Sequence, residues 1–175
     1  MPQSEQELEI YIFHLEDEPL RVNYPSNLEI ALHERFDLEK PDFISSDDET
    51  EHSFTFRCCG KDCRIVYLIF DGEHRERPND AKLKAALLHI LDWKIDSNGD
   101  GGFHHFDHLI SLGVEESSIW LITGYANSAR AKLASYQKSK GEVRIVAKPA
   151  PVNELVDEMV GLIAERLGDD CLMRA

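Results

Sequence analysis

A chain of 175 residues is long enough for one domain with a sizeable core, and its net charge of −14 disfavours direct binding to nucleic acid. The basic residues look scattered among acidic ones. No apolar run approaches the roughly 20 residues that cross a membrane. The first residues, MPQSEQELEI, do not resemble a signal peptide. We therefore expect a single cytoplasmic domain over 1–175, with no nucleic-acid or membrane partner.

The first elements alternate between apolar and polar segments. Residues 8–15 (LEIYIFHL) are almost continuously apolar, which is typical of a strand buried on both faces of a parallel sheet. Residues 26–36 place apolar side chains at helical spacing and predict a helix. The stretch 37–51 is acidic and contains proline, so it predicts a solvated loop.

A β-hairpin is predicted next. The apolar segments 52–59 and 63–70 flank a turn that begins at Gly60. Residues 82–91 (KLKAALLHIL) leave two alternatives open, because a short apolar run suits either a buried strand or one face of a helix.

The second half of the chain alternates helices and strands. This pattern predicts a parallel sheet covered by helices on both faces and joined by right-handed crossovers. The expected elements are a helix over 102–113, a strand over 118–123, a helix over 127–138, a strand over 143–147 and an amphipathic helix over 152–167.

In such a sheet the functional site lies at the carboxyl ends of the strands. The side chains expected there are carboxylates, one hydroxyl and one ammonium group. Carboxylates can hold a hydrated Mg²⁺, and a further aspartate can act as a nucleophile toward phosphorus. The hydroxyl and the ammonium would then neutralise the phosphoryl oxygens. The residues at the strand ends are Glu16, Asp17, Glu18, Asp71 or Asp92, Thr123 and Lys148.

Four segments, in this order and spacing, resemble the receiver domain of two-component response regulators. They are LEDEP at 15–19, ILDWKI with a following GDG at 90–101, LITGYA at 121–126 and AKPAPVNEL at 147–155. The resemblance implies an α/β fold with a doubly wound, five-stranded parallel sheet of order 2-1-3-4-5, as in flavodoxin. The segment 37–63 would be a loop and hairpin insert that adds one antiparallel edge strand.

Spacing favours Asp92 over Asp71 as the phosphoacceptor. The family separates its acceptor from the Thr or Ser by roughly thirty residues, which fits Asp92 and Thr123. The resemblance implies two sets of roles. Mg²⁺ would be bound by Asp17, Asp92, the backbone carbonyl of Lys94 and, through water, Glu16. Phosphoryl binding and switching would fall to Thr123 and Lys148.

The implied function is a phosphoacceptor in a two-component or phosphorelay system rather than an enzyme with turnover. A histidine kinase or phosphotransfer protein would supply the phosphoryl group, and phosphorylation would switch a surface that binds an unknown downstream partner. Two features depart from the family. Ile145 replaces its frequent aromatic switch residue, and Lys94 and Tyr125 could crowd the site and slow hydrolysis of the aspartyl phosphate.

Two alternatives remain at this point. The chain could be a receiver-like protein-interaction module that is not phosphorylated. It could also be a calcium-binding protein, since residues 96–107 place Asp96, Asn98, Asp100, Gly101 and Asp107 at EF-hand positions. Against calcium, Asp107 stands where the loop normally has Glu. Zinc binding by His104, His105 and His108, or by the cysteines at 58, 59 and 63, is a weaker possibility.

Overall fold

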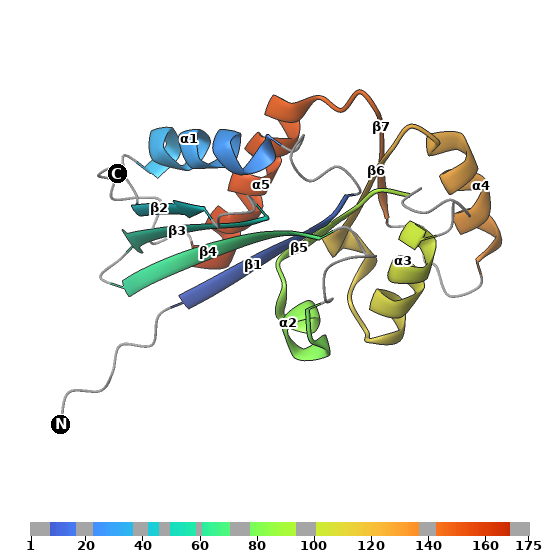
Figure 1. Cartoon of the computed structure of the whole chain (residues 1–175), viewed down its shortest axis with the longest axis horizontal. Coiled ribbons are helices and arrows are strands. Elements are labelled where there is room, and N and C mark those ends of the chain that lie inside the picture. Colours follow the sequence, from blue (N-terminus) through green and yellow to red (C-terminus); the bar gives the residue numbers. More distant parts are fainter. Residues whose placement is uncertain are drawn as a thin grey trace. The chain divides into compact units, whose positions relative to one another are not determined.

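The computed structural model describes residues 8–16, 23–36, 42–45, 50–58, 61–70, 78–93, 101–136 and 143–168. These residues form an α/β fold, as predicted (Figure 1). The elements are β1 (Leu8–Leu15), α1 (Tyr24–Phe36), β2 (Asp42–Ser45), β3 (Glu51–Cys58), β4 (Lys61–Phe70), α2 (Asp80–Ala85), β5 (Leu88–Leu91), α3 (Gly101–Ser111), the 3-10 helix η2 (Glu116–Ser118), β6 (Ile119–Thr123), α4 (Ala126–Ser135), β7 (Arg144–Ala147) and α5 (Val152–Leu167).

The hydrogen-bonded strand order is β2-β3-β4-β1-β5-β6-β7. The pairs β1–β5, β5–β6 and β6–β7 are parallel, whereas β2–β3 and β3–β4 are antiparallel. The predicted count of strands is wrong, because two antiparallel strands extend the sheet instead of one. The extra strand, β2, lies inside the stretch 37–51 that the sequence predicts to be a loop. It is only four residues long, and its backbone bonds are made with β3.

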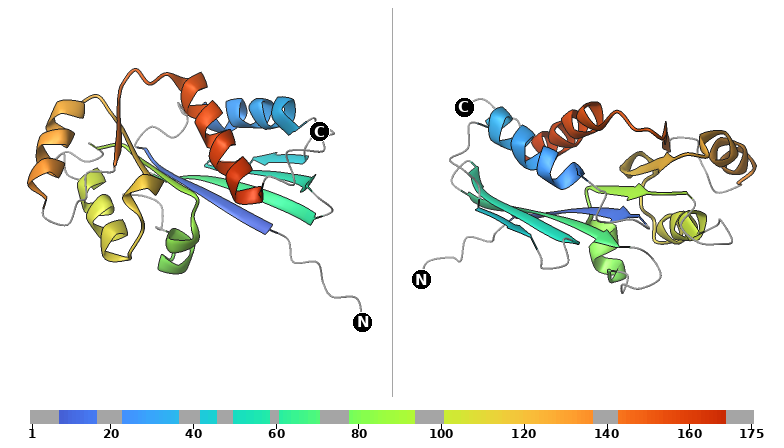
Figure 2. Two further views of the ribbon diagram at one scale, coloured as in Figure 1. Left: turned by 180° about the vertical axis from the view of Figure 1, so that it is seen from behind. Right: turned by 45° about the horizontal axis from the view of Figure 1, so that its top comes forward.

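The chain divides into two compact units that interleave along the sequence, and β1 and β4 contribute residues to both. The first unit comprises Met1–Tyr11, Leu20–Leu68 and Pro151–Ala175. Within it, α1 and α5 lie together on one face of the antiparallel strands (Figure 1 and Figure 2). Both helices and the strands β3 and β4 contribute to its core, which includes Leu28, Leu32, Phe54, Phe56, Cys63, Ile65, Leu155, Met159 and Ile163.

The second unit comprises Ile12–Pro19 and Ile69–Ala150. It contains the carboxyl end of β1, the parallel strands β5, β6 and β7, and the helices α2, α3 and α4. All residues of β5 and β6 are buried, which matches their mostly apolar sequences, LHIL and IWLIT. The register aligns the strand ends, with Leu15 beside Leu91, Leu91 beside Leu121, and Thr123 beside Ala147.

The ambiguous segment 82–91 contains both a helix and a strand. The short helix α2 begins after Asn79, whose side chain accepts a hydrogen bond from the Lys82 amide at 3.0 Å. Ala86 has extended backbone angles and ends the helix, and β5 begins two residues later. Asp92 therefore follows directly after a buried parallel strand.

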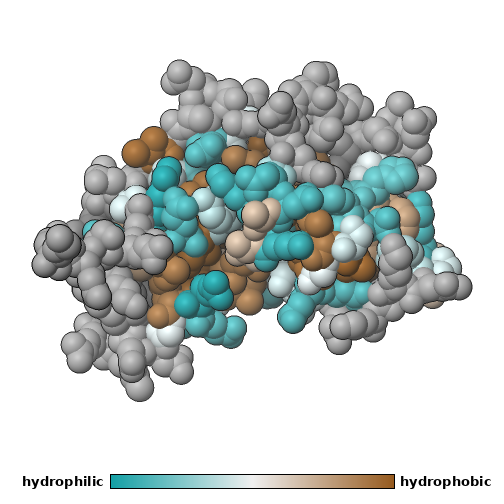
Figure 3. Space-filling model, turned by 90° about the horizontal axis from the view of Figure 1, so that it is seen from below, coloured by the Kyte–Doolittle hydropathy of each residue, from teal (hydrophilic) through white to brown (hydrophobic). Residues whose placement is uncertain are grey.

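Three large hydrophobic side chains are exposed among the described residues: Ile30, Ile44 and Tyr125. On the face drawn in Figure 3, hydrophobic residues show as separate areas between hydrophilic ones. None of the helices in the described ranges is long and apolar enough to cross a membrane.

Candidate functional site

Backbone hydrogen bonds hold the carboxyl ends of the strands of the second unit side by side. The Asp92 amide donates to the Leu15 carbonyl at 2.9 Å, which joins the ends of β5 and β1. The Lys148 amide donates to the Thr123 carbonyl at 2.9 Å, which joins the ends of β7 and β6. These bonds place the residues that follow each strand at one edge of the sheet, where the parallel arrangement predicts a site.

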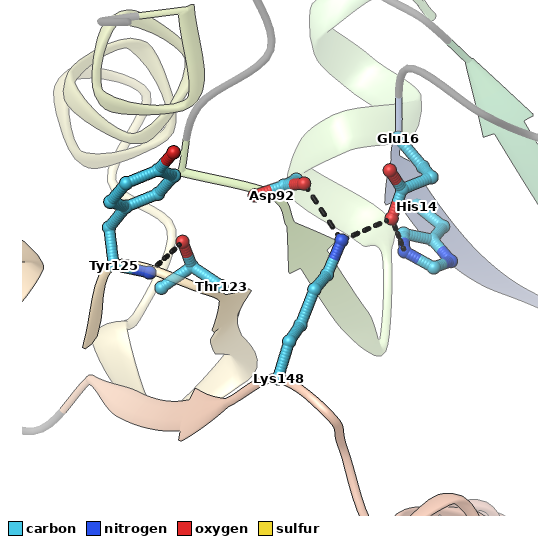
Figure 4. Close-up of polar contacts among 6 residues, drawn as sticks. All are labelled: His14, Glu16, Asp92, Thr123, Tyr125 and Lys148. Atoms are coloured by element: carbon cyan, nitrogen blue, oxygen red, sulfur yellow. Dashed lines mark hydrogen bonds and ion pairs between the residues drawn. The ribbon is translucent and has the colours of Figure 1, made fainter.

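The Lys148 ammonium lies between two carboxylates at this edge (Figure 4). Its Nζ is 2.8 Å from Asp92 Oδ2 and 3.0 Å from Glu16 Oε2. Both carboxylate side chains are only 11% exposed, so water screens these contacts weakly. Burial alone would lower the pKa of Lys148, but hydrogen bonds and charge interactions with Asp92 and Glu16 outweigh it and raise that pKa. The lysine is therefore charged at neutral pH.

Thr123 supplies a buried hydroxyl on the strand beside Lys148. The residue is fully buried, and its Oγ1 accepts a hydrogen bond from the Tyr125 amide at 3.1 Å. Accepting this bond leaves the hydroxyl hydrogen available as a donor. The same bond fixes the turn into α4, and the Tyr125 side chain is half exposed at the start of that turn.

His14 lies behind Glu16 on β1 (Figure 4). Its Nε2 is 4.0 Å from Glu16 Oε2, which is too long for a hydrogen bond. Complete burial, reinforced by the nearby charge of Lys148, lowers the pKa of His14 to about 3. The ring is therefore neutral at physiological pH, and among the described residues the charged groups at this edge are the two carboxylates and the lysine.

Gly102, the second residue of α3, lies against the backbone of the candidate acceptor. A Cβ atom on Gly102 would lie 2.0 Å from the Asp92 carbonyl oxygen and 2.8 Å from the Cα of Trp93. Only glycine fits this contact, because the obstructing atoms are backbone and cannot rotate away. Sequence reasoning missed this role, and the only available signal was the pair of glycines at 101–102.

The structure brings together four of the predicted site residues: Glu16, Asp92, Thr123 and Lys148. Tyr125 lies beside them. The other predicted site residues, Asp17, Asp71 and Lys94, fall outside the described residues. The choice of Asp92 over Asp71 therefore stays a prediction.

Two of the residues predicted to bind Mg²⁺, Glu16 and Asp92, lie at this edge of the sheet. In the described part of the chain, no group of three or more His, Cys, Asp or Glu side chains is arranged to hold a metal ion. Two carboxylates do converge on a single cation, the Lys148 ammonium. Carboxylate oxygens are the ligand type that Mg²⁺ prefers, so the predicted Mg²⁺ site stays a prediction.

The residues of the alternative metal sites have other surroundings. Helix α3 begins at Gly101, the sixth position of the candidate calcium loop, so positions 6–12 are helical and cannot wrap around an ion. Asp107 accepts a hydrogen bond from the Tyr136 hydroxyl. His108 Nε2 lies 3.1 Å from Asp80 Oδ1, and His105 is buried with its ring edge against Phe70.

Cys63 is buried in β4. The side chains of the cysteines at 58 and 59 lie outside the described residues.

No protein-family model matches this chain, and no curated protein matches it by sequence. The motifs and the geometry at the strand ends therefore carry the functional argument.

Proposed function

We propose that this protein is a receiver domain that accepts a phosphoryl group on Asp92 in a two-component or phosphorelay system. The observation that carries the proposal is the position of Lys148, whose ammonium contacts both Asp92 and Glu16. Thr123, on the neighbouring strand, adds a buried hydroxyl at the same edge. An aspartate, a lysine and a hydroxyl with these positions are the groups that transfer to a carboxylate requires.

The chemistry assigns one role to each group. An Asp92 oxygen attacks the phosphorus of a phosphohistidine on a kinase or phosphotransfer protein, and the P–N bond breaks as the P–O bond forms. Lys148 and the Thr123 hydroxyl stabilise the negative charge of the phosphoryl oxygens. Mg²⁺, held by Asp17, Asp92, the Lys94 carbonyl and, through water, Glu16, would supply further positive charge at the same place.

The switching role follows from the charge balance at the site. In the unphosphorylated protein the Lys148 ammonium contacts both carboxylates and balances one of their two negative charges. A phosphoryl group on Asp92 adds negative charge and competes for the ammonium and for the Thr123 hydroxyl. Such a change biases a two-state partner-binding surface. Turnover of a separate substrate is not part of this proposal.

The fold is also a proposal at the finer level. The strands β4-β1-β5-β6-β7 follow the order expected of the five-stranded flavodoxin-like sheet, and β2 and β3 extend it at one edge. The Glu16 amide donates to the Phe70 carbonyl at 3.0 Å, which joins the carboxyl ends of β1 and β4. This supports a parallel arrangement of these two strands within the proposed fold.

The proposal is tested with Mg²⁺ and beryllofluoride, a mimic of the phosphoryl group. Trp93 adjoins Asp92 in the sequence, so its fluorescence should change on addition of both reagents. The change should disappear in Asp92→Asn. It should persist in Asp80→Asn, which removes a carboxylate from a helix surface instead.

Direct phosphorylation gives an independent measurement. A small phosphoramidate should add one phosphoryl group to the wild type, and hydroxylamine should release it because it is an acyl phosphate. A protein that neither responds to beryllofluoride nor takes up phosphate would be the interaction module without phosphotransfer. Equal uptake by Asp92→Asn would reject Asp92 as the acceptor.

A further inference from the structure

Strand β2 lies at the end of the sheet. It pairs with β3, and no strand in the described ranges pairs with its other side (Figure 1). Successive residues of a strand direct their backbone N–H and C=O groups to opposite edges. About half of these groups in Asp42–Ser45 therefore point away from β3, where an added strand can form hydrogen bonds with them.

One large apolar side chain is exposed on this edge strand. Ile44 is 63% exposed and lies directly opposite Ser53 of β3 in the register. Directly opposite residues share a face of the sheet. Ser53 is buried although its side chain is small, whereas Ile44, one strand further out, is exposed. A strand added beside β2 would cover Ile44 in the way that neighbouring strands cover side chains inside the sheet.

The sequence around β2 concentrates the negative charge of the chain. Residues 37–51 contain seven acidic residues and one basic residue, Lys40, which gives this stretch a net charge of −6 out of −14 for all 175 residues. Charge acts on a partner over roughly 8 Å at physiological salt, so the attraction needs no particular ion pair.

This charge selects the kind of partner that can approach the edge. Two copies paired at β2 would place two acidic stretches side by side and repel each other. Nucleic acids and anionic membranes are repelled for the same reason. A basic protein segment is attracted instead, and its backbone can supply the missing hydrogen bonds.

We propose that β2 is a docking edge for an extended, basic segment of another protein, which binds as an additional strand of the sheet. Backbone hydrogen bonds to Asp42–Ser45 would hold the segment, and one of its apolar side chains would cover Ile44. Because β2 is only four residues long, few bonds form and the complex is weak and exchanges quickly. Docking at β2 uses no group of the Asp92 site, so it does not require phosphorylation.

The probe for this docking is a short, capped peptide that alternates valine and lysine. The wild type should bind it at low salt, with amide NMR shifts concentrated in β2 and β3, and the amide hydrogens of β2 should exchange with water more slowly in the complex. The affinity should fall as salt rises. The same peptide N-methylated throughout keeps its charge but donates no backbone hydrogen bond, so it should bind at least about tenfold more weakly.

The substitution Ile44→Lys removes the apolar contact and places a positive charge at the edge. It should weaken peptide binding at least about fivefold. Ile30→Lys is the matched control, because it makes the same change at an isoleucine of α1 that is 57% exposed. Its affinity should stay within about twofold of the wild type. Circular dichroism checks that both variants are folded.

Four results would overturn the proposal. The wild type could fail to bind the peptide, which would mean that the acidic charge only protects the edge from pairing. The N-methylated peptide could bind as tightly as its parent, or the two isoleucine variants could lose affinity equally, and either result would leave a charge effect without strand pairing. Sedimentation of the protein alone could show self-association that Ile44→Lys abolishes, which would make a second copy the occupant.

Discussion

The substitution Gly102→Ala tests how closely α3 approaches the candidate acceptor. The added methyl carbon would lie 2.0 Å from the Asp92 carbonyl oxygen, whereas ordinary contacts are 3.4–4 Å. The two backbone segments must therefore separate by about 1 Å or more. Forced separations of this kind cost about 1–3 kcal/mol, and the better helix propensity of alanine returns at most about 1 kcal/mol. We expect a net loss of about 1–2 kcal/mol in the free energy of unfolding.

Urea unfolding followed by circular dichroism measures this loss. Gly161→Ala in α5 is the matched control, because its Cβ would meet no atom within 4 Å. The control should be more stable than the wild type by about 0.5–1 kcal/mol. Gly102→Ala should also weaken the response to Mg²⁺ and beryllofluoride, since displacing the Asp92 backbone moves its carboxylate away from Lys148. Unchanged stability together with an unchanged response would show that the backbone contact does not position Asp92.

Three further expectations follow from the site. Lys148→Met removes the cation that contacts both Asp92 and Glu16, so the affinity of the protein for Mg²⁺ should rise. A fluorescence titration measures this affinity, and a lower value than in the wild type would contradict the role of Lys148 in the charge balance. Burial lowers the pKa of His14 to about 3 and that of His89 to about 4, whereas the unfolded chain takes up these protons near pH 6.5. The free energy of unfolding should therefore fall as pH drops below 6.5, by up to about 1.4 kcal/mol per pH unit for each histidine, and His14→Gln should reduce the slope in urea titrations. If Lys94 and Tyr125 obstruct the attacking water, the double alanine variant should lose its phosphoryl group faster than the wild type, and an equal half-life would reject that role.

Sequence periodicity predicted the long elements well. The predicted strand over 8–15 is β1, and the amphipathic pattern over 152–167 is α5. Both are long enough for the period of their apolar residues to be clear. The alternation of strands and helices also predicted which chain ends meet, because parallel strands bring their carboxyl ends to one edge. Glu16, Asp92 and Lys148 could be selected on that basis.

Features that depend on tertiary contacts were not visible in the sequence. Strand β2 is too short to show a period and lies in an acidic stretch, and its backbone bonds come from β3. Residues 82–91 divide at Ala86, which no apolar pattern indicates. The tight contact at Gly102 depends on how α3 packs against Asp92.

The local charge balance was missed for a different reason. Residues 119–153 contain six basic residues and one acidic residue, Glu142, and a charge count over the whole chain concealed this local excess.

The contacts of Lys148 join parts of the chain that are far apart in sequence, separated by 132 residues from Glu16 and by 56 from Asp92. During synthesis from the N-terminus, both carboxylates leave the ribosome long before the lysine does. Parallel strands also pair only after the intervening crossover has formed, which makes such contacts slow to appear. We therefore expect the site to be completed late in folding, and a chain that stops before β7 would lack the cation of these two carboxylates.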